Sequence, residues 1–260
     1  MVRSAFPFLQ EKAPGYESYG RVGVAELYGE NIKSLRTVAV NTVTTMVFLN
    51  RGEKFEAVDL PVEAQWSPAF GVSVADADGD GAEDVFLAQN FFAMNPEAGR
   101  HDAGRGLWLK GDGKGKLQAM PGHESGVKVY GEQRGAAVAD FDGDGRIDIA
   151  VTQNGADTKL YRNASARPGL RVRLKGPPGN PTGVGAAMRL EFAGGKGPVK
   201  EIHSGSGYLS QDGAVQVLGA RETPAAVWVR WPGGKETSVK AASGVRELEI
   251  GVDGQGRVVK

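Results

Sequence analysis

The C-terminal third of the chain alternates apolar and polar residues in short runs. Residues 170–175 read Leu-Arg-Val-Arg-Leu-Lys, the pattern of a strand with one buried face. Similar runs, separated by glycine, proline or asparagine turns, predict further strands at 184–192, 198–203, 214–219, 225–231, 236–240 and 245–250. Seven or so short strands in this part of the chain predict a compact β-sandwich.

The middle of the chain repeats one apolar element. Val47–Asn50, Leu107–Lys110 and Leu160–Asn163 each read as a short strand that enters a polar turn, and they recur every 53 to 60 residues. Repeats of this size that contain several short strands are typical of β-propeller blades. The sequence therefore predicts a mainly β protein with a partial β-propeller of two to three blades.

The N-terminal part carries apolar residues at helical spacing within 17–35, namely Val24, Leu27, Tyr28, Ile32 and Leu35. We expect a short helix that packs on the blades, although three glycines in this run weaken it. These patterns divide the chain into an N-terminal helical or irregular segment (1–45), a repeat region (46–163) and a C-terminal β domain (164–260).

Two nearly identical acidic loops lie within the repeats. The first reads Asp76-Ala-Asp78-Gly-Asp80-Gly-Ala-Glu-Asp84, and the second begins 64 residues later and reads Asp140-Phe-Asp142-Gly-Asp144-Gly-Arg-Ile-Asp148. Each runs into an apolar segment that ends in Gln-Asn, which predicts a strand. Four carboxylates this close repel one another unless a cation lies between them. Alternate residues of a tight loop suit Ca²⁺, which takes six to eight oxygen ligands.

The predicted calcium ligands occupy equivalent positions in the two loops. They are the carboxylates of Asp76, Asp78, Asp80, Asp84, Asp140, Asp142, Asp144 and Asp148, with the backbone carbonyls of Ala82 and Arg146 at the seventh position. An EF-hand would need flanking helices and a glutamate at position twelve, where this chain has Leu87 and Val151. The remaining alternative is a pair of acidic turns without a metal ion.

Composition excludes several classes of protein. The 260 residues carry no formal net charge, so nothing indicates a nucleic-acid or anionic-membrane partner. No apolar run reaches 18 residues, so we expect no membrane span. Cysteine is absent, which excludes disulfides and thiol chemistry. The N-terminus lacks the apolar core of a signal peptide, although a trimmed chain would look the same.

No motif predicts catalysis. His203, Ser210 and Asp212 lie close in sequence, but they are better explained as residues of a polar turn than as a triad. The long insertion 91–106, which contains His101, is either a salt-linked loop or a site for an anion or sugar. Trp66 is either a packing residue or a sugar-stacking one, whereas Trp108 and Trp228 are expected in the core.

The acidic repeats resemble the FG-GAP/VCBS repeats of integrin-like β-propellers. The C-terminal motifs Gly205-Ser-Gly-Tyr-Leu-Ser-Gln211 and Val229-Arg-Trp-Pro-Gly-Gly234 are similar to those of the ASPIC/UnbV domain of cartilage-acidic-protein-like chains. The resemblance implies calcium at both loops and an extracellular or periplasmic location, but no reaction. Because such propellers need about seven blades, we expect further blades upstream of this chain. The alternatives are self-association that completes the ring and a helical segment that covers the open edge.

Three functions remain open at this point. The first is a calcium-binding, non-catalytic β module for extracellular binding, adhesion or assembly, with two Ca²⁺ ions and a protein or glycan partner. The second is a polysaccharide-binding or polysaccharide-active accessory protein that uses the 91–106 loop and Trp66. The third is an assembly fragment of a larger protein whose activity lies upstream.

Overall fold

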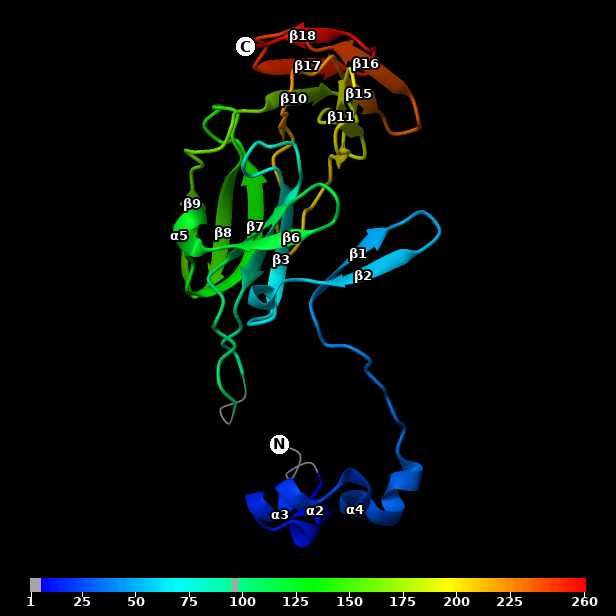
Figure 1. Ribbon diagram of the computed structural model, residues 1–260, viewed down its shortest axis with the longest axis vertical. Coiled ribbons are helices and arrows are strands. Elements are labelled where there is room, and N and C mark those ends of the chain that lie inside the picture. The colour runs from blue at the N-terminus through cyan, green and yellow to red at the C-terminus, as the bar shows by residue number, and fades with distance from the viewer. Residues whose placement is uncertain (1–5, 95–97) are drawn as a thin grey trace. The chain divides into compact units, whose positions relative to one another are not determined.

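The computed structural model describes residues 6–94 and 98–260 (Figure 1). The chain divides into two compact units, Met1–Val43 and Thr44–Lys260. The fold is mainly β, with 37% of residues in strands and 12% in helices, which confirms the predicted fold class at this level. Within the described residues, no helix is both long enough and apolar enough to cross a membrane.

Short helices make up the first unit. They are α2 (Phe8–Lys12), α3 (Tyr16–Arg21), α4 (Val24–Tyr28) and the 3-10 helix η1 (Gly29–Ser34). The short helix predicted within 17–35 is present as α4, with α3 before it and η1 after it. Gly23 has extended backbone angles before α4, and Gly29 takes a φ of 53° after it, so both glycines interrupt the helical hydrogen bonds. The expected packing of this segment on the blades stays a prediction.

A β-hairpin opens the second unit. β1 (Met46–Asn50) pairs antiparallel with β2 (Phe55–Asp59), and the 3-10 helix η2 (Val62–Ala64) follows. Val47 packs against a small core that contains Leu87 and Leu109, so one face of the hairpin is anchored. The hairpin also leaves Phe48 and Phe55 exposed, at 60% and 68% of their surface.

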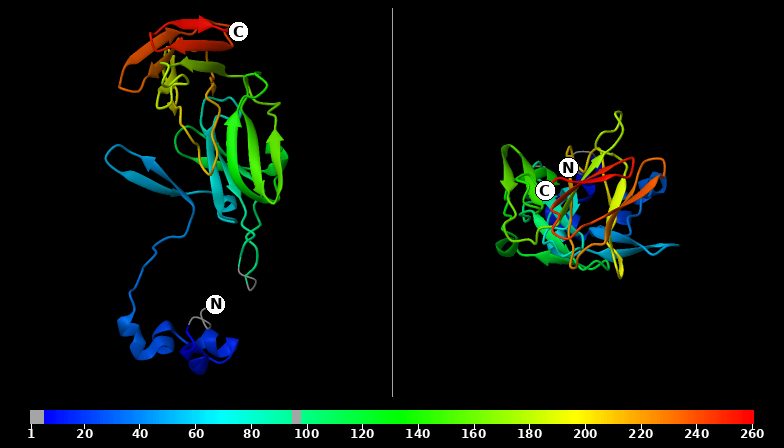
Figure 2. Two further views of the ribbon diagram at one scale, coloured as in Figure 1. Left: turned by 180° about the vertical axis from the view of Figure 1, so that it is seen from behind. Right: turned by 90° about the horizontal axis from the view of Figure 1, so that it is seen from above.

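Two antiparallel sheets follow the hairpin. The first has the order β3-β4-β5-β6, and the second has the order β7-β8-β9; the second sheet is seen from behind in Figure 2, with its three strands side by side. Their strands are β3 (Ala69–Ala75), β4 (Asp84–Gln89), β5 (Leu107–Gly111), β6 (Leu117–Met120), β7 (Glu132–Ala139), β8 (Asp148–Asn154) and β9 (Ala156–Tyr161). The short helix α5 (Gly122–Ser125) follows β6 and precedes β7 in the chain. The described strands do not close into a ring.

The first two strands of each sheet pair in the same register around the acidic loop that joins them. Ala75 pairs with Asp84 across the first acidic loop, and Ala139 pairs with Asp148 across the second. The first strands of the two sheets, β3 and β7, lie against each other. Ser73 Oγ in β3 donates a hydrogen bond to the carbonyl of Ala136 in β7, 3.2 Å away. The repeat seen in the sequence is therefore a repeat of strand pairs that each end in an acidic loop.

The third strands show that the repeated element aligns differently from the sequence-based prediction. Val85 pairs with Leu109 in the first sheet, and Ile149 pairs with Tyr161 in the second. Lys110 is therefore equivalent to Arg162, whereas the sequence pattern aligned it with Asn163. In each sheet, the third strand therefore carries a cationic side chain at the same position, Lys110 in β5 and Arg162 immediately after β9.

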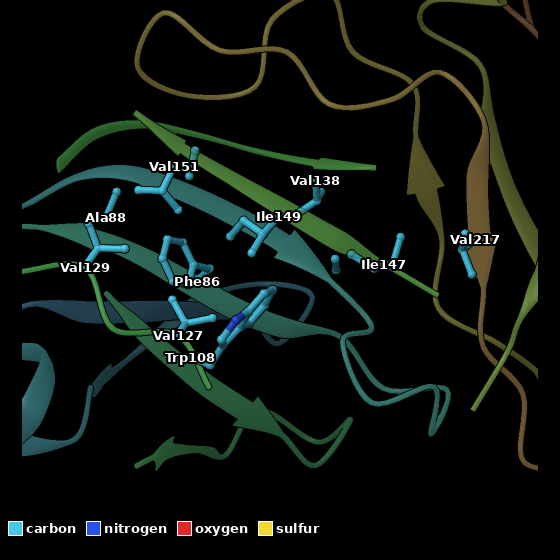
Figure 3. Close-up of a cluster of buried hydrophobic side chains, with 12 residues drawn as sticks. Phe86, Ala88, Trp108, Val127, Val129, Val138, Ile147, Ile149, Val151 and Val217 are labelled. Atoms are coloured by element: carbon cyan, nitrogen blue, oxygen red, sulfur yellow. The ribbon is translucent and has the colours of Figure 1, made fainter. Parts of the chain in front are cut away.

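A buried cluster joins the two sheets (Figure 3). Phe86 and Trp108 lie with their ring centroids 5.2 Å apart, and both rings are almost fully buried, as predicted for Trp108. Ile149 and Val151 of β8 belong to the same cluster. Because this core contains side chains from both sheets, it holds the two acidic loops in a fixed relation to each other.

The C-terminal part forms two further sheets. The first has the order β14-β10-β17-β18, and the second contains β12-β11-β15-β16 with β13 paired to β11. Their strands are β10 (Leu170–Lys175), β11 (Ala187–Phe192), β12 (Gly195–Lys196), β13 (Lys200–Glu201), β14 (Gln216–Leu218), β15 (Ala226–Arg230), β16 (Glu236–Lys240), β17 (Glu247–Gly251) and β18 (Gly256–Val258). Every predicted strand range overlaps one of them.

The two C-terminal sheets enclose one core. Val172 and Ile250 from the first sheet and Met188 and Val227 from the second are fully buried in it, as expected of a sandwich-like domain. The prediction of a core position for Trp228 is wrong. Its ring lies under the Arg189 guanidinium, 4.1 Å from the ring centroid, and its indole N–H donates to an exposed glutamate.

Candidate metal centres

The first acidic loop joins β3 to β4 and is closed by its own carboxylates. Asp76 accepts hydrogen bonds from the amides of Asp80, at 3.0 Å, and Gly81, at 2.8 Å. Gly79 and Gly81 have φ angles of 73° and 85°, values that side-chain-bearing residues rarely adopt. The glycines therefore let the loop curl around the first carboxylate.

The last carboxylate of this loop connects it to the next strand. Asp84 accepts hydrogen bonds from the amide of Ala77, at 2.9 Å, and from the amide of Gly111 in β5, at 2.8 Å. It is only 1% exposed. Burial raises the pKa of Asp84 to about 6, although these two amides act in the opposite direction. Burial likewise raises the pKa of Asp76.

The second loop, between β7 and β8, repeats these contacts. Asp140 accepts hydrogen bonds from the amides of Gly143 and Gly145, each at 2.8 Å. Asp148 accepts from the amides of Phe141, at 3.0 Å, and Asn163, at 2.7 Å. Burial raises the pKa of Asp148 as well. The two loops thus present their first and last carboxylates in the same way.

Three of the four predicted carboxylates converge in each loop. Oxygens of Asp76, Asp78 and Asp84 lie within 4.8 Å of one another, and the same holds for the second group, which consists of Asp140, Asp142 and Asp148. Carboxylate oxygens at this spacing suit a hard divalent cation such as Ca²⁺. The residues present therefore fit the ion that the sequence predicts.

The fifth-position aspartates face arginines instead. Asp80 Oδ2 lies 3.0 Å from Arg221, and Asp144 Oδ2 lies 2.9 Å from Arg146 and 3.1 Å from Arg162. Burial opposes the charge of Asp80 and of Asp144, but hydrogen bonds and the arginines outweigh it and lower the pKa of each. At the seventh position, the amides of Ala82 and Arg146 donate to the preceding aspartate at 2.9 Å, and the ligand role of their carbonyls stays a prediction.

Cations of the third strands lie beside both loops. Lys110 pairs with Asp78, and the equivalent Arg162 pairs with Asp142. Four aspartates of the first loop face two cations, Lys110 and Arg221, which leaves two unbalanced negative charges. Four aspartates of the second loop face three arginines, at 146, 162 and 171, which leaves one. On charge alone, the first loop would therefore attract a divalent ion more strongly than the second.

Asn163 joins the two loops. Its amide donates to Asp148, while its side-chain nitrogen donates to the carbonyls of Ala77, at 2.7 Å, and Ile147, at 3.1 Å. One side chain thus hydrogen-bonds to the backbone of both loops. A change of shape in either loop alters the surroundings of the other.

The sequence predicts a polar turn for Ser210 and Asp212 and leaves a binding role open for His101 and Trp66. Ser210 Oγ donates to the carbonyl of Tyr208 and Asp212 accepts from the amide of Val138, so neither contacts the other as in a triad. His101 lies on an isolated bridge with Phe91, and part of its loop, 95–97, lies outside the described residues. Trp66 is 55% exposed. The sugar-binding interpretation of these residues stays a prediction.

Comparison with known families concerns the C-terminal sheets. Residues 176–257 match the family model described as ASPIC and UnbV. This segment is an ASPIC/UnbV domain. A search of curated proteins finds no match to the chain. The ASPIC/UnbV match covers strands β11 to β17 and ends within β18, and the acidic loops lie outside it.

Proposed function

We propose that this protein is a calcium-binding, non-catalytic β module that serves in binding or assembly. The observation that carries the proposal is the same arrangement of three converging carboxylates in two loops of equivalent register. The chain's resemblance to exported cartilage-acidic-protein-like proteins extends the proposal to a location outside the cytoplasm.

The proposal includes an assignment of the two sheets as FG-GAP/VCBS blades. Three features support it: antiparallel order, an acidic loop between the first two strands, and first strands that lie against each other. In a propeller the first strands of neighbouring blades meet near the axis in this manner. The antiparallel β1–β2 hairpin would correspond to the last two strands of a further blade.

The chain's own residues would hold the ion by charge and by loop shape. Asp76, Asp78 and Asp84 would bind it in the first loop, and their equivalents would bind it in the second. Calcium supplies two positive charges that offset the repulsion between buried carboxylates. Because Asp84 also accepts a hydrogen bond from Gly111, an ion in the first loop would tie the β3–β4 turn to β5.

Calorimetric titration tests the proposal. We expect two calcium-binding events, the tighter one at the first loop because it retains more negative charge. Asp78→Asn should remove the tighter event and Asp142→Asn the weaker one, since each change takes away one converging carboxylate. Asp157→Asn, an exposed acid on β9 outside both loops, is the matched control and should bind as the parent does. A parent protein that binds no calcium at millimolar concentration would refute the proposal.

Calcium affinity should also depend on pH. The raised pKa of Asp84 means that its contribution to the stability of the metal-free fold is greatest below 3.8, the ordinary value for an aspartate, and is lost as the pH rises through about 6. A bound ion requires the ionised form, so protons compete with calcium below about pH 6. Titrations at pH 7.5 and pH 5 should differ by roughly tenfold in affinity at the first loop. Equal affinities would show that Asp84 is not a ligand.

A further inference from the structure

Both acidic loops are covered by the part of the chain that leads into and forms the ASPIC/UnbV domain. Gly219, just after β14, packs against Asp76 so closely that an added Cβ would lie 1.8 Å from Asp76 Oδ2. No side chain fits there unless the loop moves. The position of the domain and the shape of the first loop are therefore linked by direct contact.

The linker backbone makes the same connection to both loops. The Arg167 amide donates to the carbonyl of Asp78 at 3.1 Å, and the Gly169 amide donates to the carbonyl of Gly145 at 2.8 Å. Gly79 has no room for a side chain, because a Cβ there would lie 2.2 Å from the carbonyl oxygen of Arg167. These hydrogen bonds exist only while both loops keep their present conformation.

Charged side chains of the C-terminal sheets complete the contact. Arg221 donates through Nε to the Asp80 carbonyl at 2.6 Å and through Nη2 to its carboxylate at 3.0 Å. Arg171 of β10 reaches the carboxylate of Asp140 in the second loop. Lys200 of β13 lies 3.3 Å from Glu83, next to the last aspartate of the first loop.

We propose that metal binding at the acidic loops and docking of the ASPIC/UnbV domain on them are energetically coupled, so that the domain responds to the metal state of the loops. This inference rests on the proposed calcium binding. Metal binding and domain docking require the same conformation of the first loop. The carboxylates must converge to bind the ion, and Asp76 must leave room for Gly219 when the domain docks. Each event therefore favours the other, and the coupling is reciprocal.

An opposing electrostatic effect is smaller. The arginines of the domain and the metal ion are all positive, so they repel one another across the loop. Arg221, however, is 64% exposed, and an exposed ion pair of this kind changes an equilibrium by no more than about fivefold. Asp80 also has two oxygens, and Arg221 approaches only Oδ2. The shared loop conformation therefore determines the sign of the coupling at the first loop.

Hydrogen exchange of the parent protein tests the coupling directly. With calcium, we expect slower exchange of the amides at 166–169, except Pro168, which has none, and at 216–221. These amides belong to the linker and to the domain, and their residues hold no proposed ligand. The amides of β16, on the far sheet of the domain, serve as the internal control and should not change. If calcium binds by calorimetry but the exchange of 166–169 and 216–221 is unchanged, the coupling is refuted and the calcium proposal stands.

Two variants test the reciprocal effect. Gly219→Ala pushes on Asp76 without altering a ligand and should lower calcium affinity at the first loop by about tenfold. Arg221→Gln keeps the packing and should speed exchange of 216–221 in the calcium-loaded protein, whereas Arg257→Gln, an exposed arginine of β18, should not. Parent-like affinity in a folded Gly219→Ala protein would overturn the coupling. If Gly219→Ala does not fold, Arg221→Gln provides the test, because exchange of 216–221 at the parent rate in that variant would also refute the coupling.

Discussion

The chelator-treated protein is expected to melt about 10 to 20 °C below the calcium-saturated protein. At free calcium one hundred times the dissociation constant, each site adds about 2.7 kcal/mol to the free energy of unfolding, so two sites add about 5 kcal/mol. In a unit of this size, each kcal/mol moves the melting temperature by about 2 to 4 °C. Scanning calorimetry with chelator, and again after calcium is restored, measures the shift.

Magnesium is the control for the identity of the ion. It prefers a small octahedral site and loses its water reluctantly, so it should restore little of the lost stability. A protein with both Asp78→Asn and Asp142→Asn should show no calcium-dependent shift, because each loop has then lost one of its converging carboxylates. Identical melting curves of the parent in chelator and in calcium would contradict the proposed function.

Replacing Arg171 with methionine is expected to lower the free energy of unfolding by about 3 to 5 kcal/mol. Its guanidinium lies between the carboxylates of Asp140 and Glu247, whose side chains are 0% and 4% exposed. Burial opposes the charge of Glu247, but the arginines at 171 and 173 outweigh it and lower its pKa. Without Arg171, two buried carboxylates lose their main counter-charge. Urea unfolding in chelator measures the loss apart from any effect on metal binding.

Arg173→Met is the matched control. Arg173 contacts the same Glu247 at 3.1 Å but is 47% exposed, so its loss should cost only about 0 to 1 kcal/mol. The stability that Glu247 contributes in the parent is present above the ordinary glutamate pKa of 4.5 and is lost as the pH falls through its lower folded value. The gap between parent and Arg171→Met should therefore narrow in acid. Equal losses in the two variants would show that Arg171 does not compensate buried charge.

The sequence was most informative where the contacts are local. The spacing of Asp76, Asp78 and Asp84 is sufficient to predict their convergence, because a nine-residue loop with two glycines brings them together by itself. Most strands of the C-terminal domain were predictable for the same reason, since alternation records which face of each strand is buried. The spacing of apolar residues within 17–35 predicted a short helix, but it did not show that the glycines at 23 and 29 divide this stretch into separate helices.

Contacts between distant parts of the chain were beyond this reasoning. Asp80 meets Arg221 across 141 residues, and no local pattern connects the two. The equivalence of Lys110 and Arg162 needed the strand register, because loops of different length precede the two residues. In the sequence, the arginines that pair with the aspartates of the acidic loops cannot be told from ordinary surface residues. Only the fold shows which carboxylates they contact.

The pairing of β10 shows where the structural boundary of the C-terminal domain lies. β10 ends at Lys175, just before the family match begins at 176, yet it lies between β14 and β17 in the middle of its sheet. It pairs parallel with β17, so its partner arrives from the other end of the domain sequence. An excised segment cut at the family boundary would lack an interior strand and would expose Leu248 and Ile250 to water. The smallest piece that keeps its sheet whole starts before Leu170.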